Sequence, residues 1–138
     1  LASLSFNVEN DVQIDTEAPK VVDIQLSTDE VKAPGEITVT VKASDDVSGV
    51  KWGEACFYET ETETTLRASL DFKNSGLCKQ TIIIEQYTPA GKYVLSHVML
   101  QDNLGHNMYY AGDAYPYTNT HEDLPANLAS LSFDVVND

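Results

Sequence analysis

Carboxylate side chains are the most abundant groups in this chain that could do chemistry. The sequence has 22 acidic and 8 basic residues, which gives a formal net charge of −14. Asp45 and Asp46 lie in the turn sequence DDVSG, and Asp102 begins the turn sequence DNLGHN. Calcium takes about six to eight oxygen ligands, mostly from carboxylates and carbonyls, so these three residues are candidate calcium ligands. The alternative is that they cap tight turns and face water.

The charge also excludes several classes of partner. A strongly negative chain is repelled by nucleic acid phosphates and by anionic lipid, so neither is expected to bind. No apolar run approaches the length of a membrane span, and membrane insertion is not expected. No cofactor is required by any motif, and Ca²⁺ is the ion that the acidic turns suggest.

Two cysteines, Cys56 and Cys78, are a second source of chemistry. They lie 22 positions apart, a spacing that fits neither a CxxC redox motif nor a zinc-binding motif. In an exported protein, an even number of cysteines is compatible with one disulfide bond. Two buried free thiols are the alternative, and the sequence leaves both open.

Aromatic side chains could form a surface on which sugar rings stack. Several tyrosines gather in YYAGDAYPY (109–117), and Tyr115 and Tyr117 are the candidate ligand-binding residues. The alternative is that this segment covers the edge of the fold.

Catalytic patterns are not found. His97, His106 and His121 show no HxxxH or HExxH spacing, and no serine lies in a GxSxG motif. His97 lies in an apolar strand, where a hydrogen-bonded structural histidine is expected rather than a general base. The chain is therefore not expected to be an enzyme.

Short strands must position all of these residues. Ile37, Val39 and Val41 alternate with polar residues, which is the period of a strand with one buried face. The three isoleucines at 82–84 predict a central strand. Seven to eight such strands predict an all-β fold, an antiparallel β-sandwich. The expected strands are 20–27, 36–44, 49–59, 64–72, 79–87, 90–101, 108–110 and 128–136.

The core of such a sandwich can be predicted from the same pattern. Trp52 lies on the third strand, where an immunoglobulin-type sandwich buries its tryptophan, and Tyr93 is placed like a tyrosine corner. The expected core residues are Ile37, Val39, Val41, Trp52, Ile82, Ile84, Tyr93, Leu95 and Phe133.

Three segments occur in a recognisable order: DTEAPKVVDIQLS, GEITVTVKASDDVSGV and YTPAGKYVLSHVMLQDNLGHNMYY. Over roughly residues 15–111 they resemble the bacterial immunoglobulin-like repeats of large secreted and surface proteins. His106 and the two cysteines depart from the usual pattern of that family. The resemblance implies that the fold is an immunoglobulin-like antiparallel β-sandwich. It also implies a bacterial protein with an extracellular location, either secreted or on the cell surface.

A peptide is doubled in this chain. LASLSFNVEND (1–11) and LASLSFDVVND (128–138) agree at nine of eleven positions. In the repeats that the chain resembles, a module ends in such a segment and the next module opens with DTxAP. We therefore interpret residues 1–14 as the terminal strand of a preceding repeat plus a linker, and residues 15–138 as one sandwich module.

The expected function is that of a non-catalytic spacer in a tandem-repeat surface or secreted protein, where the module extends and presents other domains, including adhesive ones. Its expected partners are neighbouring copies of the same repeat. The alternative is a module that binds a carbohydrate or protein ligand, including as an accessory to a secreted hydrolase.

Overall fold

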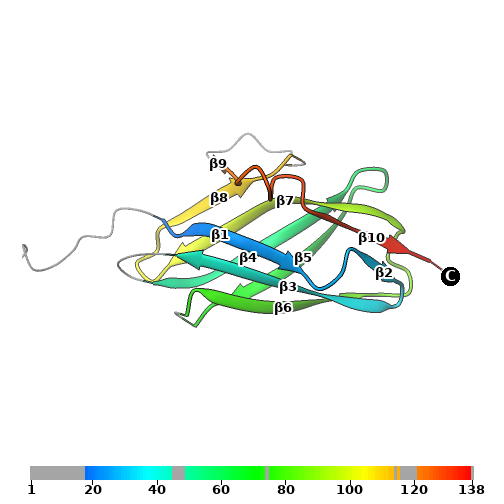
Figure 1. Ribbon diagram of the computed structural model, residues 1–138, viewed down its shortest axis with the longest axis horizontal. Coiled ribbons are helices and arrows are strands. Elements are labelled where there is room, and N and C mark those ends of the chain that lie inside the picture. Colours follow the sequence, from blue (N-terminus) through cyan, green and yellow to red (C-terminus); the bar gives the residue numbers. More distant parts are fainter. Residues whose placement is uncertain (1–17, 45–48, 74, 114, 116–120, 138) are drawn as a thin grey trace, which may run out of the picture.

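The computed structural model describes residues 18–44, 49–73, 75–113, 115 and 121–137. Every regular element in these residues is a β-strand, and the strands form two sheets (Figure 1). One sheet has the order β1-β3-β6, and the other has the order β2-β10-β7-β4-β5, with β8 paired to β7 and β9 paired to β8. The strands are β1 (Lys20–Leu26), β2 (Glu30–Lys32), β3 (Gly35–Ser44), β4 (Val50–Glu59), β5 (Thr64–Asp71), β6 (Leu77–Ile84), β7 (Gly91–Asp102), β8 (Asn107–Ala111), β9 (Glu122–Asp123) and β10 (Ser132–Val136).

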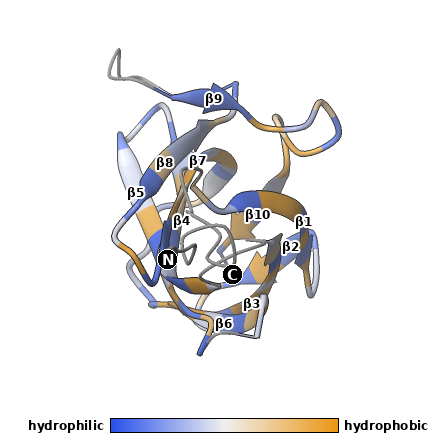
Figure 2. Cartoon of the chain, turned by 90° about the vertical axis from the view of Figure 1, so that its left-hand side faces the viewer, coloured by the Kyte–Doolittle hydropathy of each residue, from blue (hydrophilic) through white to orange (hydrophobic). Residues whose placement is uncertain are grey.

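The predicted all-β sandwich is confirmed, with two strands more than expected. The two layers are visible end-on in Figure 2, where β3 and β6 lie below β4 and β7. The additional strands, β2 and β9, pair in parallel with β10 and β8, so the larger sheet is mixed rather than purely antiparallel. Both are three residues long or shorter, which is too short for a periodic pattern in the sequence.

The core between the sheets is built from the inward-facing positions of the strands. Phe133 of β10 stacks on Tyr93 of β7, with ring centroids 5.6 Å apart, and meets the edge of Phe57 of β4 at 5.2 Å. The Tyr93 hydroxyl donates a hydrogen bond of 2.7 Å to the carbonyl of Pro89, which is the bond expected of a tyrosine corner. Eight of the nine expected core residues are buried, namely Ile37, Val39, Val41, Ile82, Ile84, Tyr93, Leu95 and Phe133.

Trp52 is the exception, and the prediction that it lies in the core is wrong. Its side chain is 39% exposed on the outer face of the larger sheet, and its indole N–H donates to Oε1 of Gln101 at 2.6 Å. The pairing of β4 with β7 shifts register between Val50 and Trp52. After this irregularity the inward positions of β4 are Ala55 and Phe57, so Trp52 falls on the opposite face.

The strand with three consecutive isoleucines is also placed differently from the prediction. β6 pairs with β3 alone in its sheet and is therefore an edge strand, not a central one. Ile82 and Ile84 are buried, whereas Ile83 points outward and is 58% exposed. The run of isoleucines thus reflects β propensity at an edge rather than burial on both faces.

One edge of β7 is shared by two strands. β10 pairs with the first half of β7, from Gly91 to Val94, and β8 pairs with the second half, from His97 to Gln101. Both run antiparallel to β7, so together they occupy the place of one long strand. Between β8 and β10 the Asp113 N–H donates a hydrogen bond of 2.7 Å to the Ala129 carbonyl, and β9 pairs with β8.

The second copy of the doubled peptide completes the larger sheet. Its strand, β10, lies between β7 on one side and β2 on the other, and Leu128, Phe133 and Val135 are all buried. The first copy, residues 1–11, lies outside the described residues, so the division of the chain at residues 14 and 15 stays a prediction.

Candidate functional site

Asp102, one of the three candidate calcium ligands, is fully buried at the end of β7. Its Oδ1 accepts hydrogen bonds from the N–H groups of Leu104 and His106 at 2.9 and 2.8 Å, and its Oδ2 lies 2.9 Å from His106 Nδ1. These contacts fit the alternative role of an acidic residue that stabilises a tight turn. Asp45 and Asp46 lie outside the described residues, so the calcium site stays a prediction.

Glu59 shows the same use of a carboxylate at the turn between β4 and β5. It accepts hydrogen bonds from the side chain and N–H of Thr62 and from the N–H of Glu61. These bonds, the Thr62 hydroxyl first, hold the pKa of Glu59 below its ordinary value because they favour the charged form. Some of the acidic side chains of this protein therefore stabilise tight turns.

The two cysteines are separate buried thiols, which is the second of the two alternatives. Cys78 lies on β6 and belongs to the core between the sheets. Cys56 lies on β4, in the other sheet, and pairs across the strands with His97 of β7. Cys78 packs in the core with Asp71 nearby, whereas Cys56 lies beside both Glu54 and His97.

A β-bulge in β7 sets the surroundings of Cys56. The pairing of β4 with β7 passes from Cys56↔His97 to Phe57↔Leu95, which leaves Ser96 as an additional residue in β7. The core positions of β7 on either side of the bulge are Leu95 and Val98, so Ser96 and His97, which lie between them, both fall outside the core layer. Bulges commonly redirect side chains in this way beside functional sites.

Three potential metal ligands meet on this outer face. The carboxylate of Glu54, the thiol of Cys56 and the imidazole of His97 each offer one ligand atom, and these atoms all lie within 4.8 Å of one another. Cys56 is 1% exposed and His97 is 8% exposed. Arg67 of β5 lies at the rim, with one guanidinium nitrogen 3.8 Å from a Glu54 oxygen.

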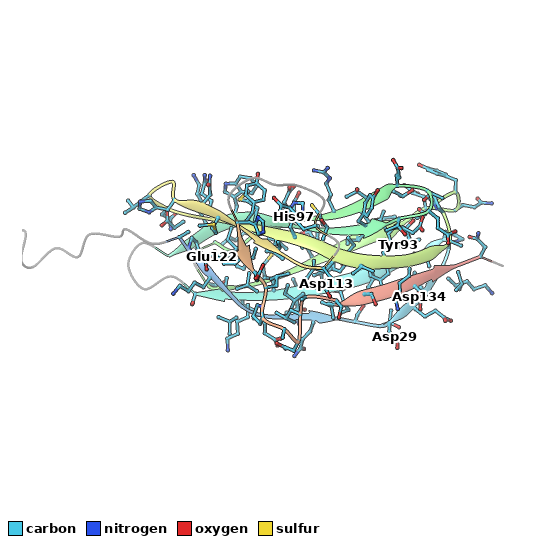
Figure 3. All side chains as sticks on the ribbon, turned by 90° about the horizontal axis from the view of Figure 1, so that it is seen from above. Asp29, Tyr93, His97, Asp113, Glu122 and Asp134 are labelled. Carbon is cyan, nitrogen blue, oxygen red and sulfur yellow. The ribbon has the colours of Figure 1, made fainter. Side chains whose placement is uncertain are left out.

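Aromatic side chains surround His97. The ring of Tyr109 lies 5.6 Å from the imidazole, and the ring of Tyr115 lies 5.2 Å from it in an edge-on arrangement. Tyr115 also meets His121 edge-on at 5.0 Å. Tyr115 therefore lies against His97, which Figure 3 labels, and His121 lies against Tyr115.

This arrangement bears on the predicted sugar-binding surface. Tyr110 is buried, and its hydroxyl donates to the carbonyl of Pro19, while Tyr115 is engaged with two histidines. These positions agree with the alternative, in which the segment covers an edge of the sandwich. Tyr117 lies outside the described residues, so carbohydrate binding stays an untested prediction.

Burial shifts the pKa values of Cys56 and His97, the two buried residues of this cluster. It raises the pKa of the Cys56 thiol to about 12, with a further contribution from the nearby Glu54 charge. Burial also lowers the pKa of His97 below its ordinary value of 6.5, although the Glu54 charge acts in the opposite direction. At neutral pH Cys56 is therefore a neutral thiol and His97 a neutral imidazole.

The sequence contained one signal for this cluster. Glu54 and Cys56 are two positions apart in a strand, which places them on one face. Nothing in the sequence indicated that His97 would lie opposite them, because that depends on the pairing of β4 with β7 and on the bulge.

Comparisons with known proteins bear on the fold. A scan against protein-family models and a search of curated protein sequences return no match. Among solved structures, Cwp6 from Clostridium difficile, a cell wall protein, is similar, with a TM-score of 0.57 and 12% sequence identity. The match covers 83% of this chain but 17% of the Cwp6 chain. It thus shows that this sandwich resembles one part of a much longer protein.

The described part of the chain contains no helix long and apolar enough to cross a membrane.

Proposed function

We propose that this chain is a structural module of a bacterial surface or secreted protein, which spaces and presents neighbouring domains outside the cell. The module is non-catalytic, and its partners are neighbouring modules of the same kind. The observation that carries the proposal is the path of the chain through the sandwich.

The chain enters and leaves the sandwich at opposite poles. In Figure 1, β1 begins at the left-hand end of the molecule and β10 ends at the right-hand end. A module of this kind adds its full length to a chain of modules when the next one follows directly. Opposite poles therefore suit a spacer better than a domain that folds back on its neighbour.

The doubled peptide supports serial modules of one kind. The second copy forms β10, held by β7 on one side and by β2 on the other. The first copy differs from it at two of eleven positions and keeps the same alternation of Leu4, Phe6 and Val8. A sequence so similar suits the equivalent slot of a preceding module, and the likeness to a segment of a cell wall protein fits a location at the cell surface.

A chain in which residues 12–138 are repeated once tests this proposal. Because the two copies of the peptide are 127 positions apart, this repetition recreates the junction that the doubled peptide implies. Small-angle X-ray scattering is expected to give an elongated particle, about twice as long as the single unit of residues 12–138. Its unfolding midpoint should match that of the single unit.

A matched control separates spacing from simple tethering. The same two-unit chain with a Gly/Ser insertion at the junction should give a broader distribution of lengths, because such linkers behave as flexible coils. A compact two-unit particle, with a maximum dimension close to that of one unit, would contradict the spacer function.

A further inference from the structure

We propose that Glu54, Cys56 and His97 bind a transition metal ion of the zinc class on the outer face of the larger sheet. This inference does not depend on the spacer function. It rests on the identity of the three ligands, on their separation and on the rigid elements that hold them.

The three side chains come from two paired strands in the middle of a sheet. Cys56 and His97 are direct cross-strand partners, and Glu54 shares the face of Cys56 two positions earlier in β4. Their ligand atoms lie within 4.8 Å of one another. Metal–ligand distances of about 2.0–2.3 Å require somewhat shorter separations, which small side-chain rotations can provide, since the Glu54 side chain is only partly buried.

The ligand types select the class of metal. A thiolate and an imidazole favour zinc and related transition metals, whereas calcium and magnesium prefer oxygen ligands alone. Three protein ligands leave the fourth position of a tetrahedral zinc ion for water or another group. The proposed ion is therefore different in kind from the calcium that the acidic turns suggest.

The hydrogen bond between Ser96 and His97 suits metal binding. The Ser96 hydroxyl lies 3.1 Å from Nδ1 of His97, and both side chains are brought to this face by the bulge in β7. Metal-bound histidines commonly hold their second ring nitrogen in such a bond, which fixes the orientation of the ring.

Binding requires the thiol to lose its proton. The metal ion takes the place of the proton on sulfur, the proton passes to the solvent, and no electron is transferred. The positive ion then offsets the Glu54 charge beside the sulfur, while His97 is already in the neutral form that binds metals. Among the described residues, Arg67, Tyr109, Tyr115 and His121 are further titratable groups around this face, and the Arg67 charge opposes binding.

Titration of the untagged full chain with Co²⁺ tests the site, because a cobalt–thiolate bond gives a charge-transfer absorption band in the near ultraviolet. We expect this band to saturate at one Co²⁺ per chain, with release of one proton, and to disappear when Zn²⁺ is added. Cys56→Ala should abolish the band and weaken Co²⁺ binding at least tenfold. Glu54→Gln and His97→Gln should each weaken binding while the thiolate band remains at higher Co²⁺ concentration.

The second cysteine provides a matched control. Cys78→Ala removes the thiol that lies in the core of the other sheet, so it should leave the band and the affinity unchanged. Circular dichroism checks that each variant is folded, and Glu54→Gln, at a partly exposed position, provides a variant that should fold if Cys56→Ala does not. Absence of the band in the wild-type chain, Co²⁺ binding without a thiolate band, or unchanged binding in Glu54→Gln would overturn the proposal.

Discussion

The two faces of the larger sheet use the same strands for different purposes. On the inner face, β4, β7 and β10 contribute Phe57, Tyr93 and Phe133, whose rings pack against one another in an apolar core. On the outer face, β4 and β7 contribute Cys56 and His97, which are almost as well buried but are surrounded by polar and titratable groups.

The difference shows that burial alone does not make a hydrophobic core. The inner face is covered by a second sheet, and its composition follows from the alternation of residues along each strand. The outer face near His97 is covered locally by Tyr109 and Tyr115. Such a cover shields titratable side chains that the second sheet does not enclose.

Truncation of Phe133 tests the inner face and has the largest expected effect. Phe133 is 1% exposed and contacts two aromatic rings. Phe133→Ala should lower the free energy of unfolding by about 3–5 kcal/mol, because it removes buried apolar surface and leaves a cavity. Urea denaturation measures this change. Phe133→Leu keeps most of the volume and should cost about 1.5 kcal/mol or less; equal losses in the two variants would show that packing at this position does not matter.

Removal of the Tyr93 hydroxyl tests a polar contact at the margin of the same core. Tyr93→Phe deletes the hydrogen bond to the Pro89 carbonyl and leaves the ring stacked on Phe133. The free energy of unfolding should fall by about 0.5–1.5 kcal/mol, measured by the same denaturation. A loss as large as that of Phe133→Ala would mean that the hydroxyl, rather than the ring, dominates at this position.

The pH dependence of stability tests the outer face and has the smallest expected effect. Burial lowers the pKa of His97 below 6.5, so the unfolded chain takes up the imidazole proton at a higher pH than the folded chain does. The contribution of neutral His97 to the free energy of unfolding is therefore fully present above about pH 6.5. It is lost as the pH falls through the lower pKa of the folded state.

The measurement for His97 is a comparison of two pH profiles. The unfolding free energies of the wild-type chain and of His97→Gln should diverge below about pH 6.5. There the wild type should lose stability more steeply, with an additional slope that corresponds to the uptake of less than one proton on unfolding. Parallel profiles between pH 7 and pH 5 would show that the imidazole is not shielded from water, and the contrast between the two faces would weaken.

Most of the fold could be predicted from the sequence, because it depends on local periodicity. All eight expected strands exist, and eight of the nine expected core residues are buried. Tyr93 was predictable as well, since its role follows from its place at the start of a strand after a turn. The prediction for Trp52 was wrong because an irregularity in the pairing of β4 with β7 reverses the face on which this side chain lies. Periodicity alone does not locate such a shift.

The outer-face cluster could not be predicted for the same physical reason. Cys56 and His97 are far apart in the sequence and meet only through the register of two strands. The contact of Tyr115 with His97 joins two residues outside any common strand pair, and no local pattern in the sequence determines it. The candidates that the sequence did suggest were acidic turn residues, and of these the structure describes Asp102, whose carboxylate binds the backbone of its own turn.

The central claim is that the second copy of the doubled peptide completes this sandwich and that the first copy does not. Phe6 and Phe133 occupy the same position in the two copies, so Phe6→Ala and Phe133→Ala are matched substitutions. Measured by urea denaturation of the full chain, Phe6→Ala should leave the free energy of unfolding unchanged, whereas Phe133→Ala should lower it by about 3–5 kcal/mol. Comparable losses in both variants would contradict the claim, because the first copy would then be part of the same fold.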